Sequence, residues 1–123
     1  PYVGAKGVVD IVPNPLSRAE KQRLTRRYTA EILPIIGVDK DIPAPDMGTD
    51  EQTMAWIMDT YSNFVGSAQP GIVTGKPVSI GGSITRREAT GRGAMAIAKE
   101  ASTKLNHDFE NSRLIIFRLN VVK

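Results

Sequence analysis

The amino-acid sequence predicts an α/β fold in which helices cover a partial sheet in a three-layer arrangement. Two apolar runs, Val8–Val12 and Arg113–Val122, have the length and composition of short strands. Between these runs, Ser/Thr-x-x-Glu/Gln signatures mark the starts of helices. The elements therefore follow one another as strand, helix, strand, helix, loop, helix and strand, an alternation that is typical of α/β proteins.

The first two elements are a strand and a helix near the N-terminus. Residues Val8–Val12 form the expected strand, and Pro13 ends it because proline cannot donate a ladder hydrogen bond. The segment Ser17-Arg18-Ala19-Glu20 is a capping box that opens a helix to about Leu33. An apolar residue recurs at every fourth position of this helix, at Leu24, Tyr28 and Ile32.

The remaining elements alternate between extended and helical segments. The prolines of Asp41–Asp46 favour an extended conformation. A second capping box, Thr49–Gln52, opens a helix with an apolar stripe, and a third, Thr85–Glu88, opens a helix to about Leu105. The run Arg113–Val122 then predicts a final strand.

Composition narrows the possible functions of the 123 residues, which suffice for about one domain. The chain has no apolar run that could cross a membrane and no signal-peptide pattern, so we expect no membrane association. The absence of cysteine fits a cytoplasmic protein. Basic residues exceed acidic ones by 16 to 13 but are scattered, so we expect no nucleic-acid partner. The only histidine, His107, has no second ligand nearby for a metal.

Two residues stand out as candidates for proton-transfer chemistry. Lys6 lies between Gly4 and Gly7, which let the backbone approach a ligand closely. Asp46 follows Pro45 on a stiff, non-helical segment. A rigidly placed lysine and aspartate can activate water and move a proton. The alternative is that Lys6 is a solvated lysine in a turn and that Asp46 is an ordinary turn or helix-entry residue.

Six short motifs carry a resemblance to a known family. They occur in the same order in glutamate dehydrogenases: the loop ending in Lys6, the run Asp41–Asp46, Met54-Ala55-Trp56, Thr74-Gly75-Lys76-Pro77, Gly81-Gly82-Ser83 and Ala89-Thr90-Gly91-Arg92-Gly93. The chain resembles one internal stretch of these Glu/Leu/Phe/Val amino-acid dehydrogenases, and the resemblance fades after about Ala94. It implies that residues 1–82 are part of a substrate-binding and oligomerisation domain. Residues 83–123 would be the first helix and strand of a truncated, Rossmann-like NAD(P)-binding domain.

The resemblance also implies an activity, a cofactor and site residues. Such enzymes use NAD or NADP to deaminate L-glutamate oxidatively to 2-oxoglutarate and ammonia, and they are homo-oligomers. By resemblance, Lys6 would activate water, Asp46 would move the proton and Ala44 would line the substrate pocket through its carbonyl. Arg86 and Thr90 would contact the dinucleotide, although a solvated Arg86 and a surface Thr90 explain these residues equally well.

The sequence departs from the family pattern at several glycines. Val3, Val8 and Thr85 stand where the family has glycine, and no Gly-x-Gly-x-x-Gly turn follows the expected strand at Arg113–Ile116. Such a turn holds the cofactor pyrophosphate at a helix N-terminus. We therefore expect the 123 residues alone to be inactive. The alternative function is a non-catalytic dehydrogenase remnant that associates with itself or with full-length subunits.

Overall fold

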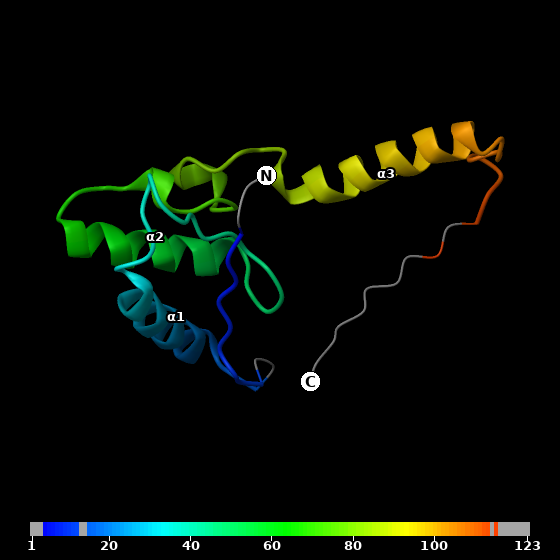
Figure 1. Cartoon of the computed structure of the whole chain (residues 1–123). Coiled ribbons are helices and arrows are strands. Elements are labelled where there is room, and N and C mark those ends of the chain that lie inside the picture. Colours follow the sequence, from blue (N-terminus) through cyan, green and yellow to red (C-terminus); the bar gives the residue numbers. More distant parts are fainter. Residues whose placement is uncertain (1–3, 13–14, 114, 116–123) are drawn as a thin grey trace. The chain divides into compact units, whose positions relative to one another are not determined.

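The computed structural model describes residues 4–12, 15–113 and 115. The chain divides into two compact units, Pro1–Arg86 and Arg87–Lys123. The described helices are α1 (Arg18–Ile32), α2 (Glu51–Val65) and α3 (Arg86–Lys104), with two short 3-10 helices, η1 (Pro70–Ile72) and η2 (Val78–Ile80). Figure 1 shows this order along the chain.

Helix α1 begins as the sequence predicts. The Ser17 backbone N–H donates to Glu20 Oε2 at 2.8 Å, and the Glu20 N–H donates to Ser17 Oγ at 3.3 Å. The Ser17 hydroxyl also donates to Glu20 Oε2 at 2.6 Å, and this bond together with the one from the Ser17 N–H lowers the pKa of the Glu20 carboxyl. The capping box therefore supplies partners for backbone groups that the first turn of a helix leaves without any.

Helix α2 is also confirmed, but its cap lies one residue later than predicted. Asp50, and not Thr49, is the N-cap, because Asp50 Oδ1 accepts from the Thr53 N–H at 2.9 Å. The Thr53 hydroxyl accepts in return from the Asp50 N–H at 3.3 Å. The helix ends at Gly66, whose φ of 76° is the left-handed conformation in which helices commonly stop.

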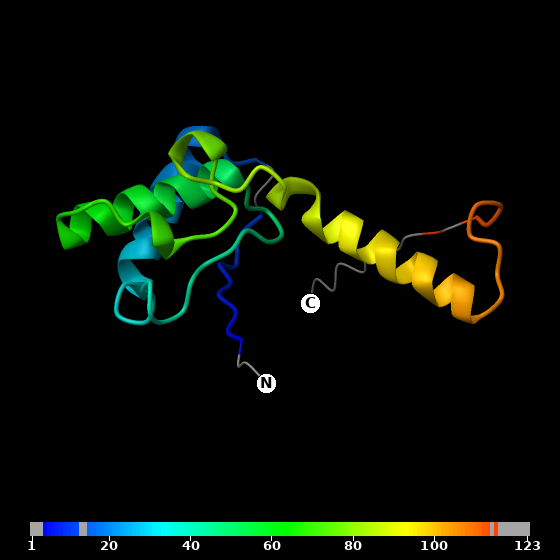
Figure 2. The same cartoon turned by 90° about the horizontal axis from the view of Figure 1, so that it is seen from above.

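The core of the first unit lies where α1 and α2 pack against each other (Figures 1 and 2). Its buried members come from α2 and from the segments after α1 and around η1: Ile36, Met54, Ile57, Ile72 and Val73. An ion pair between Arg26 Nη1 and Asp59 Oδ2, at 2.5 Å, links the two helices at the surface. This core holds the loops on either side of α2 in place.

The predicted sheet is not confirmed. The described residues form no strand, and their one isolated bridge joins Ile36 to Asp41. The prediction of a strand over Val8–Val12 is wrong for this structure, because the Ile11 N–H donates locally to the Val9 carbonyl and no described segment pairs with the run. A strand requires a neighbour that takes up its backbone hydrogen bonds. The predicted strand over Arg113–Val122 falls mostly outside the described residues.

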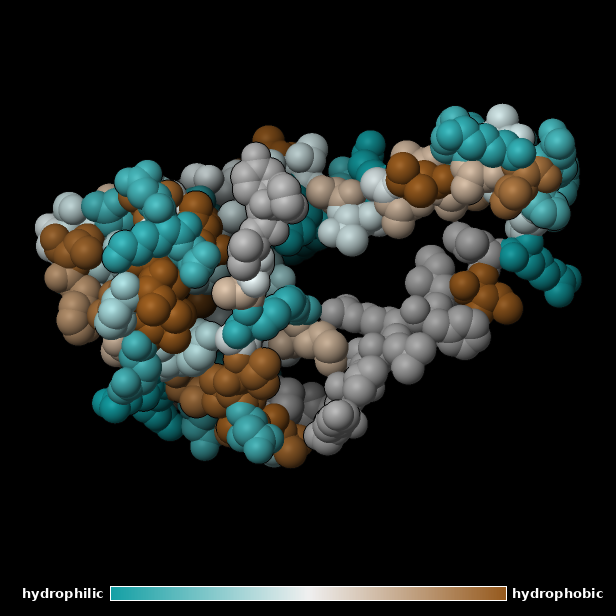
Figure 3. All heavy atoms as spheres, in the orientation of Figure 1, coloured by the Kyte–Doolittle hydropathy of each residue, from teal (hydrophilic) through white to brown (hydrophobic). Residues whose placement is uncertain are grey.

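The second unit contains all of α3 except its first residue, Arg86, and the helix starts and ends within one residue of the prediction. Asn106, with φ of 54°, follows the helix, and the His107 N–H donates to the Ser102 carbonyl at 2.9 Å. None of the α3 residues is buried. Figure 3 shows apolar and polar side chains interspersed along this helix. No helix in the described ranges has the length and apolar character needed to cross a membrane.

Candidate functional site

The structure brings the two candidate residues for proton transfer into contact. Lys6 Nζ donates a hydrogen bond to Asp46 Oδ2, 40 positions further along the chain, and the two groups form an ion pair. Both side chains are largely exposed, at 78% and 54%. The contact joins the glycine-flanked loop and the proline-rich segment, and it gives an amine and a carboxylate between which a proton can pass.

Asp46 is the first residue of a tight turn that ends at Thr49. The Thr49 N–H donates to the Asp46 carbonyl at 3.1 Å, and Gly48, the third residue of the turn, has φ of 75°. A glycine at this position is typical of a type II turn. The Met47 N–H donates to Asp46 Oδ1 at 2.8 Å, so the carboxylate that faces Lys6 is also bound to its own turn.

The segment before Asp46 is held by the loop that follows η1. The Thr74 N–H donates to the Pro43 carbonyl at 3.0 Å. Gly75 has φ of 65°, and a Cβ atom built on it would lie 2.6 Å from Pro45 Cγ. Only glycine fits so close to the proline ring in this conformation. The Thr74-Gly75 motif therefore packs against the segment before Asp46 and holds it in place.

The Lys6 loop makes a similarly close approach to helix α1. A Cβ atom built on Gly7 would lie 1.7 Å from the Tyr28 hydroxyl oxygen, so a side chain at this position would displace Tyr28. Val8, which replaces a family glycine, is 85% exposed and has room for its side chain in the described part of the chain. Packing against Tyr28 thus explains why position 7 of this loop is a glycine.

The other predicted site residues lie in two different units. Ala44 is exposed on the proline-rich segment of the first unit. Arg86, the last residue of the first unit, is the half-buried first residue of α3, and Thr90 is exposed on the same helix in the second unit. Gly91 and Gly93 lie inside α3, and a Cβ atom on either would meet nothing within 4 Å. Packing in the described residues therefore does not require these two glycines.

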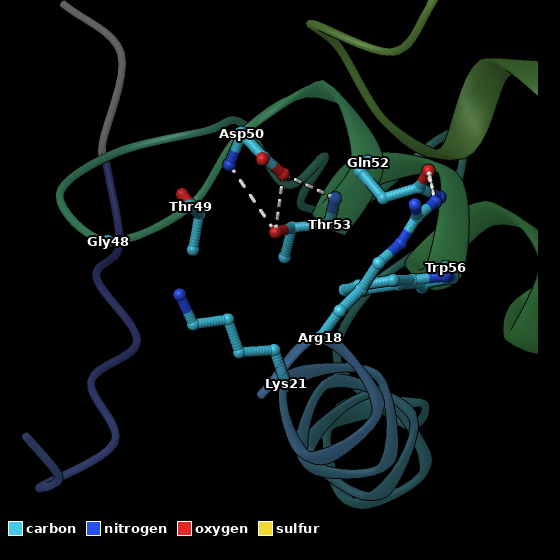
Figure 4. A pocket seen from close by; sticks show the side chains of 8 residues that line it. All are labelled: Arg18, Lys21, Gly48, Thr49, Asp50, Gln52, Thr53 and Trp56. Atoms are coloured by element: carbon cyan, nitrogen blue, oxygen red, sulfur yellow. Dashed lines mark hydrogen bonds between the residues drawn. The ribbon is translucent and has the colours of Figure 1, made fainter. Parts of the chain in front are cut away.

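Sequence reasoning missed a surface hollow of about 510 Å³ at the N-terminal ends of α1 and α2. Six of its eight lining residues have polar or charged side chains and one contributes an indole; the lining consists of Arg18, Lys21, Gly48, Thr49, Asp50, Gln52, Thr53 and Trp56. Figure 4 shows Lys21 extending toward Thr49, and Arg18 Nη2 donates to Gln52 Oε1 at 2.8 Å. The hollow includes the end of the turn that carries Asp46.

Asp50 is the acidic residue of this hollow, and its pKa is lowered. Partial burial acts to raise the pKa of this carboxyl, but hydrogen bonds from the Thr53 backbone and hydroxyl and from the Gln52 N–H outweigh burial. The positive charge of Lys21 acts in the same direction. Asp50 is therefore a charged helix cap at neutral pH. Within the described ranges, no cluster of three histidine, cysteine, aspartate or glutamate side chains could hold a metal ion.

Comparison with known families matches residues 1–63 to the Glu/Leu/Phe/Val dehydrogenase dimerisation domain. The chain is 58% identical over 99 residues to NAD-specific glutamate dehydrogenase A of Halobacterium salinarum, covering 80% of this chain and 23% of that protein. It is 50% identical over 116 residues to glutamate dehydrogenase A2 of the same organism, covering 94% of this chain and 28% of that protein. The chain therefore spans about a quarter of the length of these relatives.

Solved structures of glutamate dehydrogenases resemble the fold. The hetero-hexameric enzyme of Thermus thermophilus, in its Leu-bound form, aligns with a TM-score of 0.76 and 51% identity, over 80% of this chain and 24% of that one. The enzyme of Peptoniphilus asaccharolyticus aligns with a TM-score of 0.70 and 35% identity, over 83% and 26%.

Proposed function

We propose that this chain, which belongs to the Glu/Leu/Phe/Val dehydrogenase family, carries the proton-transfer residues of a glutamate dehydrogenase. The proposed reaction is the oxidative deamination of L-glutamate to 2-oxoglutarate and ammonia. The single observation that carries the proposal is the contact between Lys6 Nζ and Asp46 Oδ2. Names of the relatives support the choice of glutamate over other amino acids.

In this proposal Lys6 and Asp46 divide the proton chemistry between them. Lys6 polarises the water that attacks the imino carbon, and Asp46 carries protons to and from the substrate nitrogen. A carboxylate beside an amine suits this relay because the proton moves along an existing hydrogen bond. The carbonyl of Ala44 would accept a hydrogen bond from the substrate amino group. Since Lys6 and Asp46 are largely exposed here, substrate and further parts of the enzyme would have to exclude water from them.

The proposed cofactor is NAD or NADP, with Arg86 and Thr90 as contacts. The described residues do not fit the pyrophosphate, because they include no Gly-x-Gly-x-x-Gly turn between a strand and a helix. We therefore propose that the 123 residues alone do not turn over glutamate. For that isolated chain, self-association through the exposed apolar side chains of residues 8–12 is the second candidate role.

We propose the same domain division that the resemblance implies. Residues 1–82 would be part of the substrate-binding and oligomerisation domain, and residues 83–123 would start the nucleotide-binding domain. The match of residues 1–63 to a dimerisation domain supports the first part. The separation of the two compact units after Arg86 supports a boundary close to residue 82. We also propose that the protein forms a homo-oligomer and that it is located in the cytoplasm.

The proposal can be tested with a chimera. The segment of this chain that aligns with Halobacterium salinarum glutamate dehydrogenase A replaces the equivalent 99 residues of that enzyme. Reduction of NAD by the chimera is then measured with glutamate, leucine, phenylalanine and valine as substrates. The proposal predicts turnover with glutamate in the chimera and none by the isolated chain. A folded chimera that prefers another amino acid would contradict the proposed substrate, and turnover by the isolated chain would contradict the proposed need for further residues.

A further inference from the structure

We propose that Thr49 is a positioning residue whose hydroxyl aims the Asp46 carboxylate at Lys6. This inference deepens the proposed function and rests on it, because it concerns the same pair of side chains. Nothing in the role of Thr49 requires contact with substrate. Its contribution would be to fix the backbone from which the Asp46 side chain projects.

The Thr49 hydroxyl bonds to both backbone polar groups of Asp46. Thr49 Oγ1 accepts from the Asp46 N–H at 2.7 Å and donates to the Asp46 carbonyl at 2.8 Å. The Thr49 N–H adds a third hydrogen bond to the same carbonyl at 3.1 Å. A residue whose N–H and carbonyl are both bound to one hydroxyl has little freedom in φ and ψ, so the direction of its side chain is set as well.

The hydroxyl of Thr49 is not used for capping helix α2. Asp50 caps the helix, because its carboxylate accepts a hydrogen bond from the Thr53 N–H and its own N–H donates to the Thr53 hydroxyl. The hydrogen bonds of the Thr49 side chain both go to Asp46. Removal of the Thr49 hydroxyl should therefore change the Asp46 turn and leave the start of α2 intact.

The upstream side of Asp46 is fixed independently. The Thr74 N–H holds the Pro43 carbonyl at 3.0 Å, and Gly75 lies against the Pro45 ring. With Pro43 and Pro45 held, the remaining backbone freedom lies in the φ and ψ angles of Asp46, and the hydrogen bonds from Thr49 restrain these two angles. The two contacts together explain how an exposed carboxylate reaches an exposed lysine 40 positions earlier in the chain.

Zero-length cross-linking of the 123-residue chain tests this role without any need for catalysis. A water-soluble carbodiimide activates a carboxyl group, and a lysine amine in contact displaces the activated group to form an amide with the net loss of one water. Mass spectrometry of a tryptic digest then measures the yield of the Lys6–Asp46 link. The Asp46→Asn variant, which cannot be activated at this position, identifies the product.

Three threonine variants separate positioning from folding. Thr49→Val keeps the branched shape and removes the hydroxyl, Thr49→Ser keeps the hydroxyl, and Thr103→Val removes a hydroxyl that binds the Lys99 carbonyl of α3 at 3.1 Å. Thr49→Val removes both hydrogen bonds of the hydroxyl with Asp46. We expect at least about a fivefold lower yield of the link, which is the population change that loss of one of these two bonds would already produce. Thr49→Ser and Thr103→Val should keep the yield of the unsubstituted chain. Far-UV circular dichroism should show the same helix content in all variants.

Each outcome decides a different claim. An unchanged yield in Thr49→Val would overturn the positioning role while leaving the Lys6–Asp46 pair and the proposed function in place. A yield that falls equally in Thr49→Ser would also overturn it, because the hydroxyl would then not be the cause. Absence of the link in the unsubstituted chain would overturn the positioning role together with the contact that it serves. The activity of the chimera decides the proposed function separately.

Discussion

Replacement of Gly75 by alanine should destabilise the first unit through two separable effects. The first is the left-handed backbone, since alanine at the observed φ of 65° costs about 1–2 kcal/mol. The second is a clash, because the new Cβ atom would lie 2.6 Å from Pro45 Cγ and 2.7 Å from Pro45 Cδ. Relief of such overpacking against a rigid ring adds about 1–3 kcal/mol. We therefore expect Gly75→Ala to lower the free energy of unfolding by about 2–5 kcal/mol.

Gly66 provides a matched control for the second effect. Its φ of 76° is also left-handed, but a Cβ atom there would meet nothing within 4 Å. Gly66→Ala should therefore lose only the backbone contribution, about 1–2 kcal/mol. Urea unfolding can be followed by the fluorescence of Trp56, the only tryptophan, which is 9% exposed on α2. Equal losses in the two variants would refute the idea that Gly75 is required by its contact with Pro45.

Three further predictions concern the core, the helix cap and α3. Ile72→Ala, at a fully buried core position, should lower the free energy of unfolding by about 2–5 kcal/mol in the urea experiment, whereas Ile97→Ala, 72% exposed, should change it by less than about 0.5 kcal/mol. Asp50→Ala should lower the free energy of unfolding by about 1 kcal/mol at neutral pH. Because folding lowers the pKa of Asp50 from its ordinary value of 3.8, the difference in stability between the two proteins should be present above that pH and should shrink as the pH falls through the folded pKa. Urea unfolding at several pH values measures this difference. Gly91→Ala, at an open helical position, should raise the helix content seen by far-UV circular dichroism, and a decrease would indicate that the glycine meets another element.

The helices could be predicted from the sequence because their determinants are local. Ser17 and Glu20 form the predicted capping box, and the apolar stripe of α2 supplies Met54 and Ile57 to the core. The predicted strand over Val8–Val12 is wrong for this structure, because a strand depends on a partner whose identity no local pattern contains. The shift of the α2 cap from Thr49 to Asp50 shows that adjacent capping residues compete, and geometry decides between them.

The candidate site could be predicted in part. Lys6 and Asp46 were recognisable as constrained residues, but their contact across 40 positions depends on how the first unit folds. The close approach of Gly75 to Pro45 could not be derived either, since one residue precedes α2 in the sequence and the other follows it. The surface hollow likewise depends on the distance between elements, for which spacing along the chain gives no signal. The hydrogen bonds of the Thr49 hydroxyl to Asp46 are local, but the sequence pattern assigns Thr49 to the cap of α2 instead.

The central claim is that Lys6 and Asp46 act together in proton transfer. The most direct test is glutamate-dependent reduction of NAD by the chimera carrying Lys6→Ala, compared with Lys40→Ala. Lys40 is a suitable control because it is an exposed lysine of the same unit whose amine binds the Pro34 carbonyl at 3.4 Å. We expect Lys6→Ala to lower kcat by about 100-fold to 10,000-fold and Lys40→Ala to leave it unchanged. A Lys6→Ala chimera that turns over glutamate as fast as the Lys40→Ala control would contradict the account.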